Sequence, residues 1–164
     1  MIKYFKCMEN KKSLSTILFG VAMLLFVCAT FAMFGKVFNY SGAPQIPNMF
    51  QVAFGTSGAD GYRVPGMTAI FAFQMIIIVG IIAIIVGTAT NKFHYVLTIV
   101  LYCIVCLSAF IAFIISFNSL GLYSLAGRTL QPGTTLGAGP IVYSVLHILG
   151  LFTSAGGLVL SRRG

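Results

Sequence analysis

The segment Met67–Ala89 constrains this chain more than any other part of its sequence. It holds about 23 residues without a charged side chain, and Gln74 is its only strongly polar member. As an α-helix it would be roughly 35 Å long, which is enough to cross a hydrocarbon core of about 30 Å. A helix that is apolar on every face belongs in lipid or inside a large protein, and this chain has only 164 residues. We therefore expect Met67–Ala89 to span a membrane.

Three further apolar segments have the length and composition of membrane spans. Of all residues, 59% are hydrophobic and 7% are charged, against about 25% charged residues in soluble domains. The sequence predicts a single all-α integral membrane domain, an antiparallel bundle of four transmembrane helices with short connections. The first apolar run is too long for the core of a cleaved signal peptide, so we expect it to be retained. The expected spans are residues 14–34, 67–89, 94–117 and 140–160, with outer loops at 35–66 and 118–139.

The basic residues predict how the bundle is oriented. One side holds both termini and the connection between the second and third spans, and its basic residues are Lys3, Lys6, Lys11, Lys12, Lys92, Arg162 and Arg163. The opposite side holds Lys36, Arg63 and Arg128. By the positive-inside rule, both termini are cytoplasmic in a cell membrane and the two long loops face outward. We expect the net charge of +8 to meet the lipid bilayer and its anionic headgroups. Nucleic acid is not an expected partner, because no basic segment carries the interleaved aromatic residues of a stacking groove.

The first outer loop carries an alternating pattern that predicts β-structure. Residues 49–54 (MFQVAF) place three apolar side chains on one face, which is typical of a short strand. We expect this strand to pair with residues 36–40 across a proline-rich turn, and residues 62–64 to add a third strand. The result would be a small β-hairpin or sheet on the outer end of the bundle. Its candidate recognition residues are Phe38, Tyr40, Phe50, Phe54, Tyr62 and Arg63.

Polar residues within the spans predict a layer inside the bundle. His147 is the one imidazole placed deep within a span, and an ionisable group at such depth is a functional hypothesis by default. Gln74 and His147 each lie about seven residues from the outer end of their spans, or roughly 10 Å deep. Ser108, Tyr143 and Ser144 are nearby candidates. Two interpretations stay open: hydrogen bonds between helices, worth about 0.6–2 kcal/mol per contact, or a polar pocket that forms part of an ion path.

The remaining reactive side chains offer little chemistry. Cys103 and Cys106 form a C-x-x-C pair, which in the right setting is redox-active. They lie near mid-depth of the third span, and neither outer loop contains a cysteine that could relay electrons. No combination of cysteines with His94 and His147 has the spacing of a zinc site, so no metal or cofactor is expected. No expected span contains Asp, Glu, Lys or Arg. Small proton-coupled exporters depend on a carboxylate within the membrane, so the sequence does not favour that function.

Two short segments carry a resemblance to known proteins. They are Phe50–Gly55 (FQVAFG) in the first outer loop and Leu136–Val142 (LGAGPIV) at the start of the last span. Together with the basic start and four spans, this pairing resembles small uncharacterised four-span membrane proteins of Firmicutes-type bacteria. In architecture alone the chain is similar to claudins, whose first outer loop builds a sheet on a four-helix bundle. It lacks the tryptophan and the loop cysteine pair of claudins, so the resemblance implies a location and a shape but no activity.

These observations favour a non-enzymatic integral membrane protein. We expect an interaction or accessory subunit that recognises a protein partner, or a second copy of itself, through its outer loop. One alternative is a small oligomeric channel or transporter in which the layer of Gln74 and His147 lines a path. A second alternative is a membrane thiol oxidoreductase that uses Cys103 and Cys106.

Overall fold

Four long helices make up most of the structure. The computed structural model describes the chain apart from residues 1, 40–47, 56–63, 91–93, 126–131 and 162–164, and it describes no side chains for residues 2–12 and 65. The four helices are α1 (Ile2–Ala32), α3 (Thr68–Ala89), α4 (Tyr95–Phe117) and α6 (Ala138–Ser161). All of α3, α4 and α6, and the part of α1 from Ser13 onward, are long and apolar enough to cross a membrane. The four predicted spans are therefore confirmed as helices, with boundaries that differ by a few residues.

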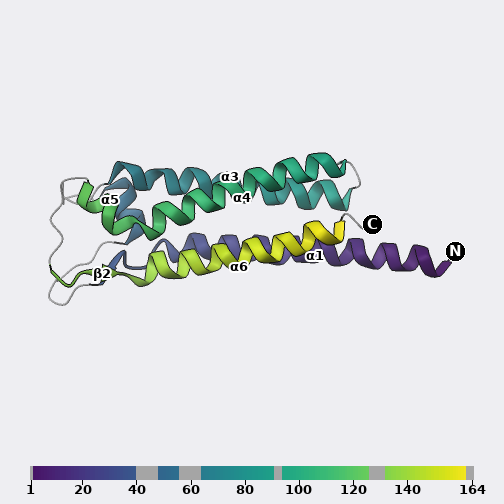
Figure 1. Cartoon of the computed structure of the whole chain (residues 1–164), viewed down its shortest axis with the longest axis horizontal. Coiled ribbons are helices and arrows are strands. Elements are labelled where there is room, and N and C mark those ends of the chain that lie inside the picture. The colour runs from purple at the N-terminus through teal and green to yellow at the C-terminus, as the bar shows by residue number, and fades with distance from the viewer. Residues whose placement is uncertain (1, 40–47, 56–63, 91–93, 126–131, 162–164) are drawn as a thin grey trace.

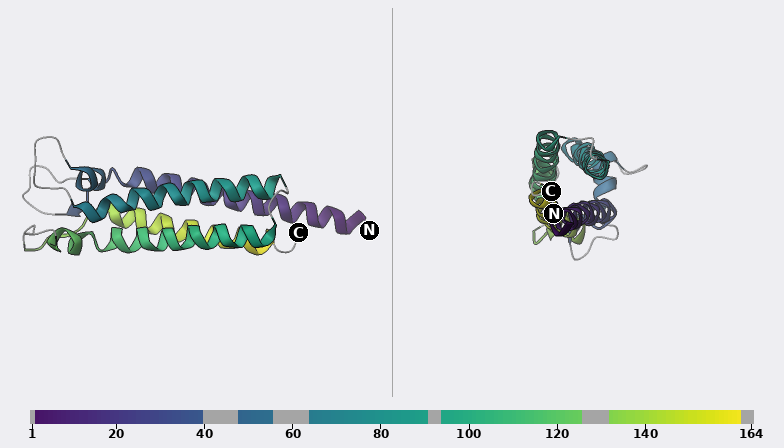
Figure 2. Two further views of the ribbon diagram at one scale, coloured as in Figure 1. Left: turned by 90° about the horizontal axis from the view of Figure 1, so that it is seen from above. Right: turned by 90° about the vertical axis from the view of Figure 1, so that its right-hand side faces the viewer.

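The four helices pack side by side with neighbours running in opposite directions (Figure 1). Helix α1 packs mainly against α6, and α3 packs mainly against α4. Smaller contacts join α1 to α3 and α4 to α6, so α1 and α4 stand at opposite corners of the arrangement seen end-on in Figure 2. Both chain termini lie at the same end, where α1 continues past the other helices. We call the opposite end, which carries the long loops, the loop end.

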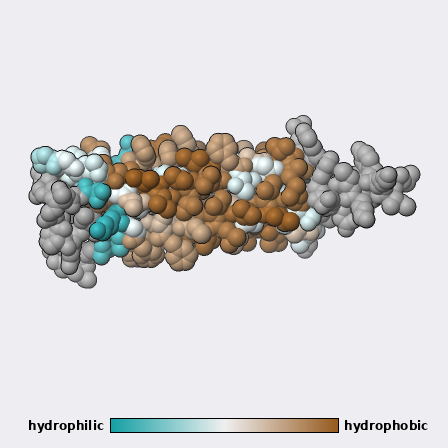
Figure 3. Space-filling model, turned by 90° about the horizontal axis from the view of Figure 1, so that it is seen from below, coloured by the Kyte–Doolittle hydropathy of each residue, from teal (hydrophilic) through white to brown (hydrophobic). Residues whose placement is uncertain are grey.

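Each helix buries one stripe of side chains and exposes the other apolar residues. On α1 the buried stripe has a spacing of three or four residues and consists of Ser15, Phe19, Ala22, Phe26, Ala29 and Met33. The rest of its surface exposes large apolar side chains, among them Leu24 and Phe31. Figure 3 shows such hydrophobic side chains along the helices of one face, with hydrophilic ones toward the loop end. A surface of this kind suits lipid, where helices satisfy their own backbone hydrogen bonds.

Small residues allow the helices to approach closely. A Cβ atom at Gly150 would lie 2.9 Å from the ring of Phe26, and one at Gly157 would lie 3.2 Å from the ring of Phe19. The hydroxyl of Ser15 donates a hydrogen bond of 2.7 Å to the Gly157 carbonyl. These small residues therefore serve packing of α6 against α1 within the bundle.

The loop end carries a cap of short elements. They are β1 (Phe38–Asn39), α2 (Met49–Phe54), the 3-10 helix η1 (Pro65–Met67), α5 (Ser119–Leu125) and β2 (Thr135–Leu136). We use the word cap for these five elements. Buried side chains of the cap, including Met49, Val52 and Met67, form one cluster with Met33 of the α1 end and Tyr143 of α6. The cap is thus part of the protein core.

Residues 49–54 form a helix, so the predicted strand is wrong. The cause is a capping box at the start of α2. The Asn48 side-chain oxygen accepts from the Gln51 N–H at 2.7 Å, and the Gln51 side-chain oxygen accepts from the Asn48 N–H at 3.0 Å. Two of the otherwise unpaired donors of the first turn are satisfied in this way. Helical spacing buries Val52 and Ala53 on one face and exposes Phe50 and Phe54 on the other, faces that the strand pattern would have grouped differently.

The strand pairing also differs from the prediction, because it joins the two loops. Strand β1 pairs antiparallel with β2, with Phe38 opposite Leu136 and Asn39 opposite Thr135. Among the described residues, one isolated β-bridge joins the segment around residue 36 to the α2 region, between Lys36 and Asn48. Residue 40 of the predicted strand 36–40 lies outside the described residues. Residues 62 and 63 of the predicted third strand also lie outside them. Val64 is described and donates its N–H to the Val52 carbonyl at 2.8 Å.

Three glycines allow the end of α1 to cross the start of α6. The Gly137 N–H donates to the Val37 carbonyl at 2.7 Å, and the Gly139 N–H donates to the Lys36 carbonyl at 3.0 Å. A Cβ atom at Gly137 would overlap the Lys36 carbonyl oxygen, and one at Gly139 would lie 2.7 Å from the Gly35 oxygen. Among the described glycines, only Gly55 and Gly133 have positive φ. Glycine is therefore required at the crossing for space and not for backbone conformation. We call Gly35, Gly137 and Gly139 the glycine junction.

Candidate functional site

A buried glutamine joins three of the four long helices. Gln74 of α3 is 1% exposed, and its amide nitrogen donates to the Phe26 carbonyl at 2.7 Å and to the Thr30 hydroxyl at 3.0 Å, both on α1. Its amide oxygen accepts from the Tyr143 hydroxyl of α6 at 2.9 Å. The Thr30 hydroxyl in turn donates to the Phe26 carbonyl at 3.2 Å. The Gln74 amide therefore uses both its donor and its acceptor sides within the bundle.

His147 lies one helical turn beyond Tyr143 and is 0% exposed. Its Nδ1 is 2.9 Å from the Tyr143 carbonyl oxygen. A carbonyl only accepts, so the proton is assigned to Nδ1 and the Nε2 of the neutral ring is an acceptor. The imidazole packs edge-on against Phe26, with ring centroids 5.3 Å apart, and against Tyr143 at 4.1 Å. Among the described residues, Nε2 has no hydrogen-bonding partner.

The two serines of the predicted layer lie at the same height as these residues. Ser144 of α6 is buried, and no described residue hydrogen-bonds its hydroxyl. Ser108 of α4 is also buried. Two hydrogen bonds set the height of α4 against α6, from the Tyr102 hydroxyl to the Leu151 carbonyl and from the Ser116 hydroxyl to the Pro140 carbonyl, each at 3.4 Å. Ser108 and His147 both fall between these two bonds, so they lie at a similar depth in the bundle.

The structure thus links Gln74 and His147 through Tyr143, which contacts both, and places Ser108 and Ser144 at a similar depth. The sequence reasoning missed Thr30 and the Phe26 carbonyl, which complete the bonding of Gln74. Thr30 is a polar residue in the loop-side part of the first span, and this position is a signal that could have identified it. The carbonyl carries no sequence signal.

Four phenylalanine rings form an exposed group beside the cap. We call Phe34, Phe50, Phe54 and Phe71 the phenylalanine cluster. Phe50 stacks on Phe34 with ring centroids 5.7 Å apart and contacts Phe54 at 4.9 Å and Phe71 at 5.5 Å, while Phe54 contacts Phe71 at 4.7 Å. Phe34, Phe50 and Phe54 are 60%, 41% and 46% exposed. Exposed aromatic side chains that hold one another in place form a patch of defined shape.

The other loop residues proposed for recognition are placed differently. Phe38 is buried, and its ring packs edge-on against Tyr123 of α5 with centroids 4.8 Å apart. Phe38 therefore supports the cap from inside. Tyr40, Tyr62 and Arg63 lie outside the described residues. Phe34 and Phe71 lie at the end of α1 and near the start of α3, outside the residues predicted for recognition, and no sequence pattern links them to the loop.

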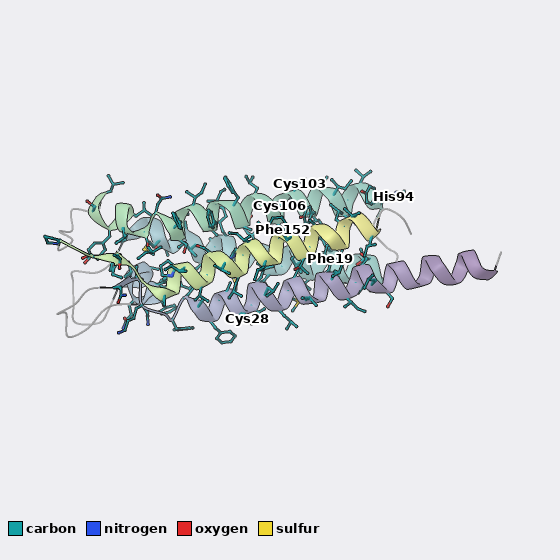
Figure 4. The ribbon with its side chains drawn as sticks, turned by 60° about the horizontal axis from the view of Figure 1, so that its bottom comes forward. Phe19, Cys28, His94, Cys103, Cys106 and Phe152 are labelled. Atoms are coloured by element: carbon teal, nitrogen blue, oxygen red, sulfur yellow. The ribbon has the colours of Figure 1, made fainter. Side chains whose placement is uncertain are left out.

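The cysteines do not gather at one site. Figure 4 shows Cys103 and Cys106 on α4 and Cys28 on α1, which are helices at opposite corners of the bundle. All three thiols are unpaired; Cys28 and Cys103 are exposed, and Cys106 is half-buried. Within the described part of the chain, no three His, Cys, Asp or Glu residues group in a way that could hold a metal ion.

No protein-family model matches this chain, and comparisons with curated proteins and with solved structures find no significant match. The phenylalanine cluster and the buried polar residues are therefore the features of this chain that bear on its function.

Proposed function

We propose that this chain is a non-enzymatic subunit of a cell membrane that recognises a membrane-embedded protein through its phenylalanine cluster. Both termini would be cytoplasmic, and the cap would face outward at the membrane boundary. The observation that carries the proposal is the exposure of Phe50 and Phe54 on α2, which is firmly held, and of Phe34 at the end of α1. Large aromatic side chains on a rigid support are typical of the residues that dominate binding energy at interfaces.

Backbone and side-chain bonds hold α2 in place. The Phe50 N–H donates to the Met33 carbonyl at 3.2 Å, and the Val64 N–H donates to the Val52 carbonyl at 2.8 Å. The Thr68 hydroxyl donates to the Ala53 carbonyl at 3.1 Å. With its buried face packed into the cap, α2 presents the rings of the cluster in one orientation. Such pre-organisation lowers the entropy cost of binding.

The chemistry of the surroundings supports a partner that is itself in the membrane. Among the side chains that the structure describes, Lys36 alone is charged, and the four rings of the cluster are apolar, which suits an apolar partner. The cluster also continues the exposed apolar surface of α1 and α3, where Phe31 and Met75 are exposed. A transmembrane helix of the partner could cover both surfaces at once through van der Waals packing.

Photocrosslinking from the cluster tests this proposal. A photoreactive phenylalanine analogue is placed at Phe50, at Phe54 or, as a control, at Phe152, which is 74% exposed on α6 away from the cap (Figure 4). In native membranes we expect one and the same protein adduct from positions 50 and 54, and lipid adducts alone from position 152. Asn48→Ala, which removes the N-terminal capping side chain of α2, should weaken the adduct. Lipid adducts alone at all three positions would contradict the proposal.

The two alternative functions have less support. All bonding groups of the Gln74 amide are used between helices, which favours a structural role over a lined path. Ion flux in proteoliposomes that disappears in a Gln74→Leu variant of normal stability would favour the channel. Cys103 and Cys106 would need a quinone or another electron acceptor, and thiol oxidation that survives Cys103→Ser and Cys106→Ser would exclude the oxidoreductase.

A further inference from the structure

Two polar atoms on neighbouring turns of α6 have no hydrogen-bonding partner among the described residues. They are His147 Nε2 and Ser144 Oγ, and both are fully shielded from solvent. Native proteins pair nearly all such groups, with protein atoms or with bound water, because a buried unpaired group loses its hydration without compensation. Two of them close together on one helix point to a common partner.

The geometry of the imidazole directs Nε2 away from its own helix. Nδ1 faces the Tyr143 carbonyl on α6 at 2.9 Å, and Nε2 lies on the other side of the ring. Helical side chains lean toward the N-terminus of their helix, so the His147 ring covers the turn that carries Ser144. Residues three apart lie on the same face of a helix. The two unpaired atoms therefore belong to one region of the bundle interior.

We propose that His147 Nε2 and Ser144 Oγ together bind one small neutral molecule that donates and accepts hydrogen bonds, and that this molecule is water. A water molecule would donate to Nε2, which in this tautomer only accepts, and would exchange a second bond with the Ser144 hydroxyl. Ser108 is buried at a similar depth on α4 and is a candidate for a third. Buried waters in proteins make about three such bonds. This site lies inside the bundle and is independent of the partner proposed for the phenylalanine cluster.

The two histidines of the chain make a direct spectroscopic test possible. Histidine labelled with ¹⁵N gives only two residues to observe, the buried His147 and the exposed His94, which serves as the solvent-accessible control. In lipid bilayers, solid-state NMR should show His147 protonated at Nδ1, with Nε2 shifted as for a hydrogen-bond acceptor. Magnetisation from water protons should reach Nε2, and it should vanish in D₂O. Three results would overturn the proposal. They are an Nε2 signal typical of a nitrogen without a hydrogen bond, a ring protonated at Nε2, and a hydrogen-bonded Nε2 that receives no magnetisation from water protons.

The Ser144→Ala variant tests whether the Ser144 hydroxyl binds the water molecule or has no hydrogen-bonding partner. If Ser144 Oγ binds the water, Ser144→Ala should lower the thermal midpoint and move the His147 Nε2 signal toward that of an unbonded nitrogen. Ser119→Ala is the matched control, since Ser119 Oγ of α5 is also buried and unpaired among the described residues. It should leave the His147 signal unchanged. An unchanged His147 spectrum in Ser144→Ala would overturn the proposal whatever the midpoint does, because the hydroxyl would then not share a ligand with Nε2.

Discussion

Alanine in place of Gly137 would put a methyl group into the crossing of α1 and α6. The nearest atoms are the Lys36 carbonyl and the Val37 backbone, which are too close to accommodate a Cβ atom. Backbone cannot rotate aside as a flexible side chain can, so the two segments must move apart. That movement stretches the hydrogen bonds from Gly137 to Val37 and from Gly139 to Lys36. It also strains the adjoining pairing of β1 with β2.

The expected loss of stability combines these effects. Forcing an extra methyl group into a packed region costs about 1–3 kcal/mol, and each weakened hydrogen bond adds up to about 1 kcal/mol. Against this, a glycine-to-alanine change at an ordinary φ returns about 0.4–1 kcal/mol through the unfolded chain. We therefore expect Gly137→Ala to lower the free energy of unfolding by about 2–4 kcal/mol, from a total of about 5–15 kcal/mol for a typical protein.

Denaturant or thermal unfolding of the purified protein in detergent measures this difference. Gly20→Ala is the matched control, because a Cβ atom at Gly20 of α1 would meet nothing within 4 Å. The control should be neutral or slightly stabilising. Amide hydrogen exchange gives a second readout, since the amides of Gly137 and Gly139 should lose protection in Gly137→Ala. Equal midpoints for the two variants, with unchanged exchange at the junction, would refute the steric reasoning.

Three further predictions concern the polar layer, the cap and the orientation. Gln74→Leu should lower the free energy of unfolding by about 2–4 kcal/mol, because three buried hydrogen bonds are lost, whereas Tyr143→Phe removes one and should cost about 0.6–2 kcal/mol; equal losses in chemical denaturation would argue against this network. Asn48→Ala should cost about 1 kcal/mol and raise hydrogen exchange in α2, and unchanged protection there would show that the capping box is dispensable. A tag fused to the C-terminus should resist protease added to intact cells, and its digestion would invert the expected topology.

The spans were predictable because lipid imposes a strict rule on sequence. A segment of about 20 residues without charge has few ways to fold other than a membrane helix, and this reasoning identified all four long helices. Depth along a helix follows from residue counting, which predicted a shared layer for Gln74 and His147, whereas the bridging contacts of Tyr143 did not follow from it. Thr30 was missed because threonine can bond to its own helix, and nothing in the sequence distinguishes the two uses.

The cap was less predictable because its signals are short. Over the six residues 49–54, alternation fits a strand and also fits a helix that buries Val52 and Ala53. The Asn48–Gln51 capping box was the deciding signal, and it was overlooked. The pairing of β1 with β2 involves two residues on each strand and joins segments far apart in the sequence, so no local pattern predicts it. Gly137 and Gly139 belong to the LGAGPIV segment that resembles other four-span membrane proteins. The structure adds that both positions require glycine because the backbone of residues 35–37 lies too close for a side chain.

The glycine junction has a consequence for how the protein is made. Its glycines lie at the end of α1 and the start of α6, the two long helices that are farthest apart in the sequence, so α1 is synthesised well before its main neighbour. Until α6 is made, the Gln74 amide oxygen of α3, which accepts from Tyr143, lacks this donor, and the Lys36 and Val37 carbonyls lack the N–H donors of Gly139 and Gly137. The contact between α1 and α6 can therefore close only after α2 to α5 have been synthesised between them.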